Sequence, residues 1–185
     1  GGRILISSNS ALELDSNNPV SLDLEANNLT IKNGGSIVDS YSHGGRNSSS
    51  IVINVINDVT HNGQISTSGR RQGAGTGNGG DAGDITINAK NLSGNGTIYA
   101  NGADGSRSSV TCKSSSTGGD AGNIIINADD QNFTGTFSAA RGCSTSGSRA
   151  GAYGSIFLND GKNLIVPAHY TFNLNDQTKG LYETI

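Results

Sequence analysis

The chain lacks most of what a compact helical or α/β domain is built from. Its 185 residues contain no Met, no Trp and two Pro, and only 32% of them are hydrophobic and 5% aromatic. Domains with a thick core need more apolar residues than this. Two options remain: disorder, or a solenoid, in which each coil buries a few small apolar side chains against its neighbours.

Charge and long apolar runs are scarce as well. The net charge of −3 provides no strong field for nucleic acid or for membrane surfaces. No apolar run approaches the roughly 18 residues of a membrane-spanning helix. We therefore predict no nucleic-acid partner and no membrane span. The sequence has neither a signal peptide nor an initiator Met, so we expect a mature or excised piece of a larger product.

A repeat of short strands is the main signal that is present. Five segments carry apolar side chains at their first and third positions, which places those side chains on one face of a strand. Gly, Asn and Ser clusters separate these segments, as expected for strands joined by turns. The segments are residues 22–26, 51–55, 85–89, 124–128 and 156–160.

Two further apolar positions follow each segment. The distance from the first to the third apolar position is 15, 14, 13 and 13 residues, which predicts three strands per coil. The distance from there to the next segment is 14, 20, 26 and 19 residues, which predicts loops of variable length on one edge. The second positions are Leu29, Val59, Leu92, Phe133 and Leu164, and the third positions are Ile37, Ile65, Ile98, Phe137 and Tyr170.

We therefore predict an all-β fold: a right-handed parallel β-helix (β-solenoid) of about five coils, each with three short strands and with variable loops on one edge. Residues 1–20 would form an N-terminal cap or degenerate coil and residues 21–169 the solenoid. Residues 170–185 would form a C-terminal cap or a strand that pairs with a partner. A β-sandwich is the alternative, but it gives no reason for the equal spacing of the strands.

Asparagine recurs at one place in the repeat. If the coils stack in register, equivalent side chains lie about 4.8 Å apart. An Asn amide can then accept a hydrogen bond from one neighbour and donate one to the other. This predicts a structural asparagine ladder at the first turn, with chance as the competing explanation because the chain has 22 Asn. The ladder residues are Asn54, Asn88, Asn127 and Asn159, each at the fourth position of its segment.

Two glycine-rich stretches are near copies. They read Gly79-Gly80-Asp81-Ala82-Gly83-Asp84-Ile85-Thr86-Ile87-Asn88-Ala89 and Gly118-Gly119-Asp120-Ala121-Gly122-Asn123-Ile124-Ile125-Ile126-Asn127-Ala128. This unit resembles the repeat of filamentous-haemagglutinin-like adhesins, which are large secreted β-helical surface proteins. The resemblance covers residues 21–160 and implies an extracellular right-handed β-helix that serves in adhesion or as a stalk. The two cysteines depart from the pattern of those adhesins.

The variable loops, residues 38–50, 66–84, 99–123 and 138–155, contain six of the seven arginines and three tyrosines. Arg forks suit carboxylate or sulfate groups, and Tyr offers a stacking face. Stacked loops would gather these side chains into a face for a ligand or partner. The alternative is that they only solubilise the loops. The residues are Arg46, Arg70, Arg71, Arg107, Arg141, Arg149, Tyr41, Tyr99 and Tyr153.

Two kinds of covalent modification are predicted. Cys112 and Cys143 lie in successive variable loops, and a disulfide between them would close a loop of about 30 residues and stabilise the fold by roughly 3 kcal/mol. Two free thiols in a reducing compartment are the alternative. Asn-x-Ser/Thr sequons are possible glycosylation sites if the protein passes a glycosylating secretory route. They begin at Asn28, Asn47, Asn91, Asn95 and Asn132.

Evidence for catalysis, metals or cofactors is weak, and we predict none of the three. Asp129 and Asp130 are the only adjacent acidic pair, but neighbours on a strand point to opposite sides, whereas hydrolysis of a glycosidic bond needs two carboxylates about 5–10 Å apart. His43, His61 and His169 fall at different places in the coil. Residues 79–84 have the wrong register for a calcium-binding β-roll unit.

The sequence therefore predicts a non-enzymatic extracellular module, structural or adhesive. It would be a segment of a surface adhesin or a subunit of an extracellular filament, located outside the cell or at its surface. Its expected partners are neighbouring solenoid domains or identical subunits, and cell-surface glycans or proteins that bind the loops. The alternative is a carbohydrate-active enzyme, because β-helices also host polysaccharide lyases and hydrolases.

Overall fold

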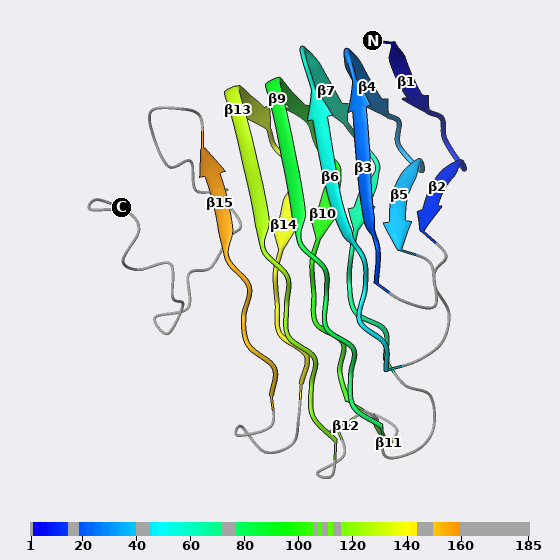
Figure 1. Cartoon of the computed structure of the whole chain (residues 1–185), viewed down its shortest axis with the longest axis vertical. Helices are drawn as coiled ribbons and strands as arrows, with labels where there is room; N and C mark the ends of the chain where they lie inside the picture. Colours follow the sequence, from blue (N-terminus) through cyan, green and yellow to red (C-terminus); the bar gives the residue numbers. More distant parts are fainter. Residues whose placement is uncertain are drawn as a thin grey trace, which may run out of the picture.

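Short strands form nearly all of the regular structure (Figure 1). This computed structural model describes residues 2–14, 19–39, 45–71, 77–105, 107–108, 111–112, 116–143 and 150–159. Those residues contain 15 strands and no helix. Several residues of the sequence predictions lie outside the described ranges: Tyr41, Arg149, Leu164, Tyr170 and the whole of the segment 170–185.

The strands stack in three columns, one strand per coil in each column. The first column contains β3 (Ser21–Ala26), β6 (Ser50–Val55), the first half of β9 (Ile85–Gly94), the first half of β13 (Ile124–Phe133) and β15 (Ile156–Asn159). The second contains β1 (Arg3–Ile6), β4 (Asn28–Ile31), β7 (Asp58–His61) and the second halves of β9 and β13. The third contains β2 (Ala11–Leu14), β5 (Ser36–Asp39), β8 (Gln64–Ser66), β10 (Thr97–Tyr99) and β14 (Thr136–Ser138).

All pairings within these columns are parallel and in register. Ile85 lies opposite Ile51 on one side and Ile124 on the other, and Ile124 in turn lies opposite Ile156. The third column aligns Ile65 with Ile98 in the same way. The predicted parallel β-helix is therefore confirmed. Four coils contain all three strands, and β15 begins a fifth.

Strands β9 and β13 run through two columns without a break. The first four residues of β9 pair with β6, and its later residues pair with β7. The chain bends between the two halves, at Ala89 and Lys90, and β13 follows β9 in register on both sides of the bend. The first and second columns consequently belong to one eight-stranded sheet, while the third is a separate five-stranded sheet.

The core consists of the inward-facing residue of every second position. Ile85 and Ile87 are fully buried, whereas Thr86 and Asn88 between them are half-exposed on the outer face. This is the alternation that one-sided burial of a strand requires. The largest fully buried side chains are Leu29, Ile31, Ile37, Ile51, Ile53, Ile65, Ile85, Ile87, Leu92, Ile98, Ile124 and Ile126.

The prediction of Phe133 as the second apolar position of its coil was wrong. The residue aligned with Leu92 is Gln131, and Phe133 lies opposite Gly94 instead. The backbone keeps its spacing where the apolar pattern is interrupted, so Gln131 takes the column position. Its Nε2 is buried and has no hydrogen-bond partner among the described residues. Phe133 uses the space over Gly94, stacking on the ring of His61 at 5.7 Å and meeting Phe137 edge-on at 5.0 Å.

The variable loops contain ordered segments that stack as the strands do. We name them the glycine-rich arms: outgoing arms 66–71, 99–105 and 138–143, and incoming arms 77–84, 116–123 and 150–155. In Figure 1 they continue the coils downward, below the strands of the three columns. Between residues 105 and 116 the chain also forms an antiparallel hairpin, β11 (Arg107–Ser108) with β12 (Thr111–Cys112).

Backbone groups hold the arms together directly. Gly119 N donates to Ala103 O at 2.8 Å within one loop, and Ala103 N donates to Gly80 O of the preceding loop at 3.0 Å. The same two bonds recur in the next loop, where Gly151 N donates to Gly142 O at 3.3 Å and Gly142 N donates to Gly119 O at 2.9 Å. The arms approach so closely that a Cβ added to Gly119 would lie 2.0 Å from Gly80 O. Glycine is therefore required here by space.

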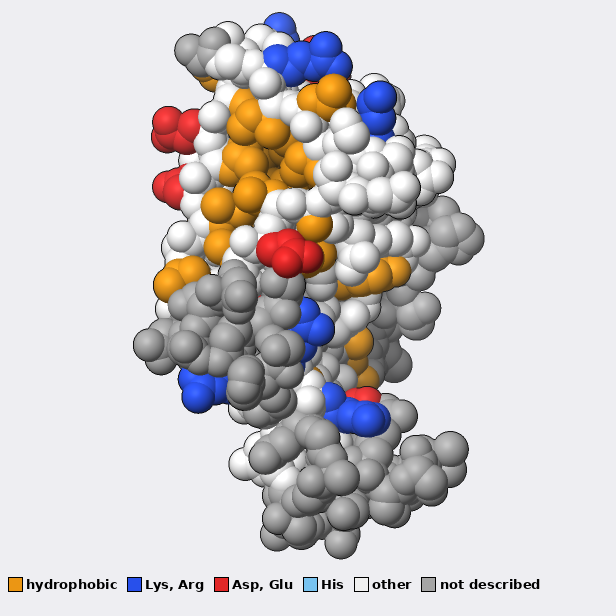
Figure 2. Space-filling view, turned by 90° about the vertical axis from the view of Figure 1, so that its right-hand side faces the viewer, with side chains coloured by type: hydrophobic (Ala, Val, Ile, Leu, Met, Phe, Trp, Pro, Cys, Tyr) orange, Lys and Arg blue, Asp and Glu red, His pale blue; other side chains and the backbone are white. Residues whose placement is uncertain are grey.

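The N-terminal residues add a partial coil to the stack. Strand β1 pairs with β4 and β2 pairs with β5, whereas β3 pairs only with β6. Figure 2 views the molecule from this end and shows apolar side chains gathered in the upper half of the view. Ile4, Leu14 and Leu22 are only partly buried against the core. The core thus reaches the surface at the N-terminal end of the described residues.

Candidate functional site

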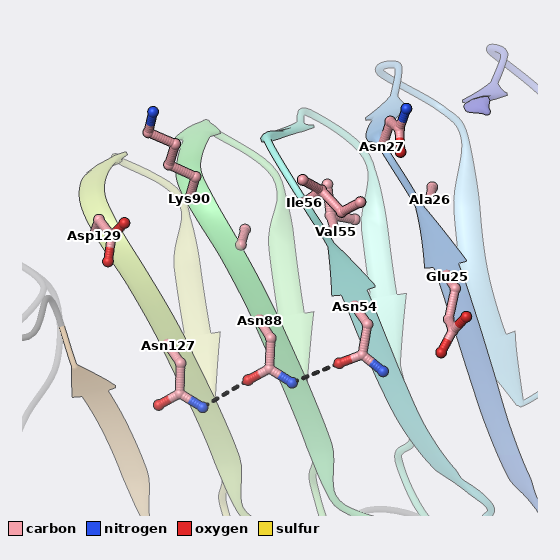
Figure 3. A pocket seen from close by; sticks show the side chains of 11 residues that line it. Glu25, Ala26, Asn27, Asn54, Val55, Ile56, Asn88, Lys90, Asn127 and Asp129 are labelled. Carbon is pink, nitrogen blue, oxygen red and sulfur yellow. Dashed lines mark hydrogen bonds between the residues drawn. The ribbon is translucent and has the colours of Figure 1, made fainter. Parts of the chain in front are cut away.

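The asparagine ladder lies on the outer face of the first column. Asn54, Asn88 and Asn127 are aligned by the strand register, and each is half-exposed. Asn88 Nδ2 donates to Asn54 Oδ1 at 2.7 Å, and Asn127 Nδ2 donates to Asn88 Oδ1 at 2.8 Å (Figure 3). The backbone of Asn159 continues the register, but its side chain lies outside the described residues.

A groove runs along this ladder, beside the bend between the first and second columns. Its volume is about 790 Å³. We name it the asparagine groove. Asn54, Asn88 and Asn127 form one side, and the residues at the bend form the other (Figure 3). Its lining is Glu25, Ala26, Asn27, Asn54, Val55, Ile56, Asn88, Ala89, Lys90, Asn127 and Asp129.

Sequence reasoning found the ladder and missed the groove. The fourth position has the opposite parity to the inward first and third positions, and this parity alone predicts an outward-facing ladder. The groove depends in addition on the bend at Ala89 and Lys90. The apolar pattern continues from Ile85 to Leu92 and gives no indication of the bend.

The carboxylates of the groove are far apart. Glu25 belongs to the first complete coil and Asp129 to the fourth. Three strand spacings of about 4.8 Å separate their backbones by roughly 14 Å, which exceeds the 10 Å that glycoside hydrolysis allows. Asp130 is aligned with Asn91 in the second column, so it does not accompany Asp129 into the groove.

Columns of side-chain acceptors connect the incoming arms. Asp81 N donates to Asn47 Oδ1 at 2.9 Å, Asp120 N to Asp81 Oδ1 at 2.8 Å, and Ala152 N to Asp120 Oδ1 at 2.7 Å. A parallel column runs through Asp84 and Asn123, whose oxygens accept from the backbone of the following coil. These contacts explain the repeated Gly-Gly-Asp-Ala-Gly-Asp/Asn phrase. The glycines allow the arms to meet, and the acidic or amide residues cap the next coil.

The predicted arginine and tyrosine face is only partly assembled. The guanidinium of Arg141 lies 4.7 Å from the centre of the Tyr153 ring, a cation–π contact between two exposed side chains. Arg70 instead points inward, where its Nη2 donates to Asp39 O at 2.7 Å and its Nε has no hydrogen-bond partner within the described part of the chain. Tyr99 lies on the outer face of the third column, between Ser66 and Ser138.

The remaining arginines of that set do not join this pair in a column. Arg46 and Arg71 are exposed, but only Arg71 belongs to an arm, because Arg46 lies shortly before β6. Arg107 lies in β11, and its side chain is outside the described residues. The register gives no succession of arginines from one coil to the next among the described arms.

Comparison with known proteins identifies no family. No protein-family model matches this chain, and no curated protein or solved structure matches it either. The resemblance to filamentous-haemagglutinin-like adhesins therefore stays a prediction, and the fold and geometry carry the functional argument.

Among the described residues, no three His, Cys, Asp or Glu side chains are grouped so as to hold a metal ion. The described part of the chain contains no helix of the length and apolar character that crossing a membrane demands.

The structure describes the side chain of one of the two cysteines, Cys143. Cys143 ends an outgoing arm and is disulfide-bonded, and no cysteine among the described residues is free. Cys143 O accepts from Gly105 N of the preceding loop, the loop that also carries Cys112 in β12. The side chain of Cys112 lies outside the described residues, so its pairing with Cys143 stays a prediction.

The sequons differ in how far their amides are engaged. Asn95 and Asn132 have exposed side chains. Asn91 Nδ2 donates to Asp58 Oδ1 at 2.6 Å, Asn47 Oδ1 accepts from Asp81 N at 2.9 Å, and Asn28 Oδ1 accepts from Asp58 N at 3.4 Å. A glycan would therefore meet least interference at Asn95 and Asn132.

His61 is a core residue. It is fully buried, and Nε2 donates to the Thr97 carbonyl at 3.0 Å, while Nδ1 has no hydrogen-bond partner in the described structure. Burial lowers the pKa of the imidazole below its ordinary value of 6.5, and the hydrogen bond to Thr97 opposes that shift only in part. A neutral ring suits its stacking on Phe133.

Proposed function

We propose that this chain is a non-enzymatic structural and adhesive module of the extracellular space, either a segment of a surface adhesin or a subunit of an extracellular filament. The observation that carries the proposal is the unbroken set of contacts along the stack. Each coil is joined to the next by parallel strands, and the asparagine ladder and the arms add further contacts between the second, third and fourth coils. Repetition of nearest-neighbour contacts gives a solenoid its stiffness and lets it extend by added coils.

The geometry of the acidic residues favours this module over a polysaccharide hydrolase. Glu25 and Asp129 stand at opposite ends of the groove, and Asp130 belongs to another column. The groove residues that recur from coil to coil are amides. Amides can hold a ligand, but they do not serve as general acids or bases at ordinary pH.

An oxidising location follows from the cysteines in this proposal. Cys143 is bonded, and Cys112 is the other cysteine of the chain. Disulfides persist mainly outside the cytoplasm. A bond between the two would connect successive loops at the outer ends of the arms, where the apolar core does not reach. Arg141 and Tyr153, exposed and in contact, form the part of the predicted adhesive face that the arms bring together.

Three measurements test the proposal. Negative-stain electron microscopy of the purified chain should show end-to-end assemblies or stiff rods, and antibodies against it should label intact cells of its source. Zymograms on neutral and acidic polysaccharides should show no clearing. Polysaccharide cleavage abolished by Asp129→Asn would replace the module with an enzyme, and labelling only after the cells are permeabilised would exclude the extracellular location.

A further inference from the structure

The asparagine ladder has unused hydrogen-bonding capacity in a regular row. The amide of Asn88 offers two N–H donors and two acceptor lone pairs, and the ladder uses one of each. Asn54 is in the same position, because it donates to Asp23 Oδ1 and accepts from Asn88. Asn54 and Asn88 thus each keep one donor and one acceptor, and these groups recur about every 4.8 Å along the groove.

Apolar surface lies next to these amides. Ile56 is 69% exposed, the highest fraction among the exposed large hydrophobic residues of the described chain. Ala26, Val55 and Ala89 line the groove beside it. A ligand in this groove therefore meets a row of paired donors and acceptors on one side and an apolar wall on the other.

The charges of the groove select against polyanions. Its lining contains Glu25, Asp129 and the single cation Lys90, so the groove carries a net negative charge. A peptide cannot add a strand here either, because β6, β9 and β13 each have hydrogen-bonded strands on both sides. A ligand can reach only side-chain groups here.

We propose that the asparagine groove binds an uncharged linear polysaccharide that lies parallel to the solenoid axis. A sugar hydroxyl both donates and accepts, which matches the free donor and acceptor of Asn54 and Asn88, and the C–H faces of the sugars cover Ile56 and Ala89. This inference rests on the proposed function, since an exported surface module is a protein that meets such polymers. It moves the adhesive site from the arginine and tyrosine face to the ladder.

The experiment uses the whole chain, labelled with ¹⁵N, and follows the side-chain amide signals of Asn54, Asn88 and Asn127. The probes are cellohexaose and chitohexaose, with a galacturonate hexamer as the polyanion and an Asn/Gln-rich peptide as the polypeptide. A neutral hexasaccharide should shift these three amides. Asn88→Asp should weaken binding about tenfold or more, because it removes a donor and adds a third carboxylate to a groove that already contains Glu25 and Asp129.

Ile56→Asp provides a second variant that leaves the fold intact, because the side chain is mostly exposed. It should weaken binding by a similar factor. Asn132→Asp, an exposed change outside the groove, is the matched control and should leave binding unchanged.

Three results would overturn the groove assignment. The first is that saturating neutral hexasaccharides shift none of the three amides. The second is that the galacturonate hexamer or the peptide binds more tightly than either neutral sugar. The third is that binding survives Ile56→Asp but is lost in Arg141→Ala. None of these results contradicts the proposed structural module, because microscopy and cell labelling test that module separately.

Discussion

The strand columns and the glycine-rich arms stack with the same register but by different physical means. In the columns, inward side chains such as Ile87 and Ile126 are fully buried in the interior. In the arms, residues such as Gly80 and Gly119 have no side chain, and backbone groups of opposing arms bond directly. One region is stabilised mainly by removing apolar surface from water, the other by hydrogen bonds in a space too narrow for a methyl group.

The largest expected effect is the loss of side-chain volume from a column. Ile87→Ala should lower the free energy of unfolding by about 2–5 kcal/mol, because the site is fully buried between neighbouring coils. Ile87→Val, which removes one methylene, should cost about 0.5–1.5 kcal/mol. Chemical denaturation measures both. A loss below 1 kcal/mol for the alanine variant would show that the columns do not depend on tight packing.

The arms, in contrast, should be destabilised by added side-chain volume. Gly119→Ala places a Cβ 2.0 Å from Gly80 O, and overpacking against backbone should cost about 3 kcal/mol, the upper part of the usual range. Gly2→Ala is the control, since nothing lies within 4 Å of its added Cβ. If the two alanine variants unfold at the same denaturant concentration, the arms are not closely packed and the contrast with the columns fails.

A smaller, stabilising effect should come from placing an apolar residue at the second-column position that Gln131 occupies. Gln131→Leu restores the apolar residue that Leu92 predicts and removes a buried Nε2 that has no partner. We expect a gain of about 1 kcal/mol, since an unsatisfied buried group costs about 1–3 kcal/mol. The melting temperature should rise, whereas a fall would mean that Gln131 makes a contact required by the fold.

The smallest effect is a dependence on pH that originates in the columns. The pKa of His61 is lowered in the folded state by burial, so the unfolded chain binds a proton first as the pH falls below 6.5. Stability should therefore be constant above pH 6.5 and decrease on acidification below it. The arms contain no equivalent buried imidazole among their described residues.

His61→Leu isolates this contribution. Urea unfolding of both proteins at pH 7.5 and at pH 5.5 gives the measurement, and the variant should lose less stability between the two values than the wild type does. Equal losses would assign the pH dependence to other groups.

The columns could be predicted from the sequence because an apolar period reports burial of side chains. Ile51, Ile85, Ile124 and Ile156 each open a segment of the repeat, and the structure aligns them. The same reasoning failed at Phe133, because it followed the apolar residue while the backbone kept a constant spacing and placed Gln131 in the column.

The arms and the groove lay beyond that kind of reasoning for two reasons. Arms that meet through Gly80, Ala103 and Gly119 bury backbone, and a backbone contact leaves no apolar period in the sequence. The groove forms because β9 and β13 bend while the residues at the bend stay on the surface. The outward ladder of Asn54, Asn88 and Asn127 could be inferred, but the space beside it could not.

The side-chain columns all point the same way. The oxygens of Asn47, Asp81 and Asp120 each accept a hydrogen from the coil that follows, as do those of Asp84 and Asn123. On one face of a stack these side-chain oxygens can accept hydrogen bonds from an added coil. On the opposite face the added coil must itself supply the acceptors. The two faces of any such stack are therefore unlike, and copies joined through these columns can meet only head to tail, which gives the resulting fibre a direction.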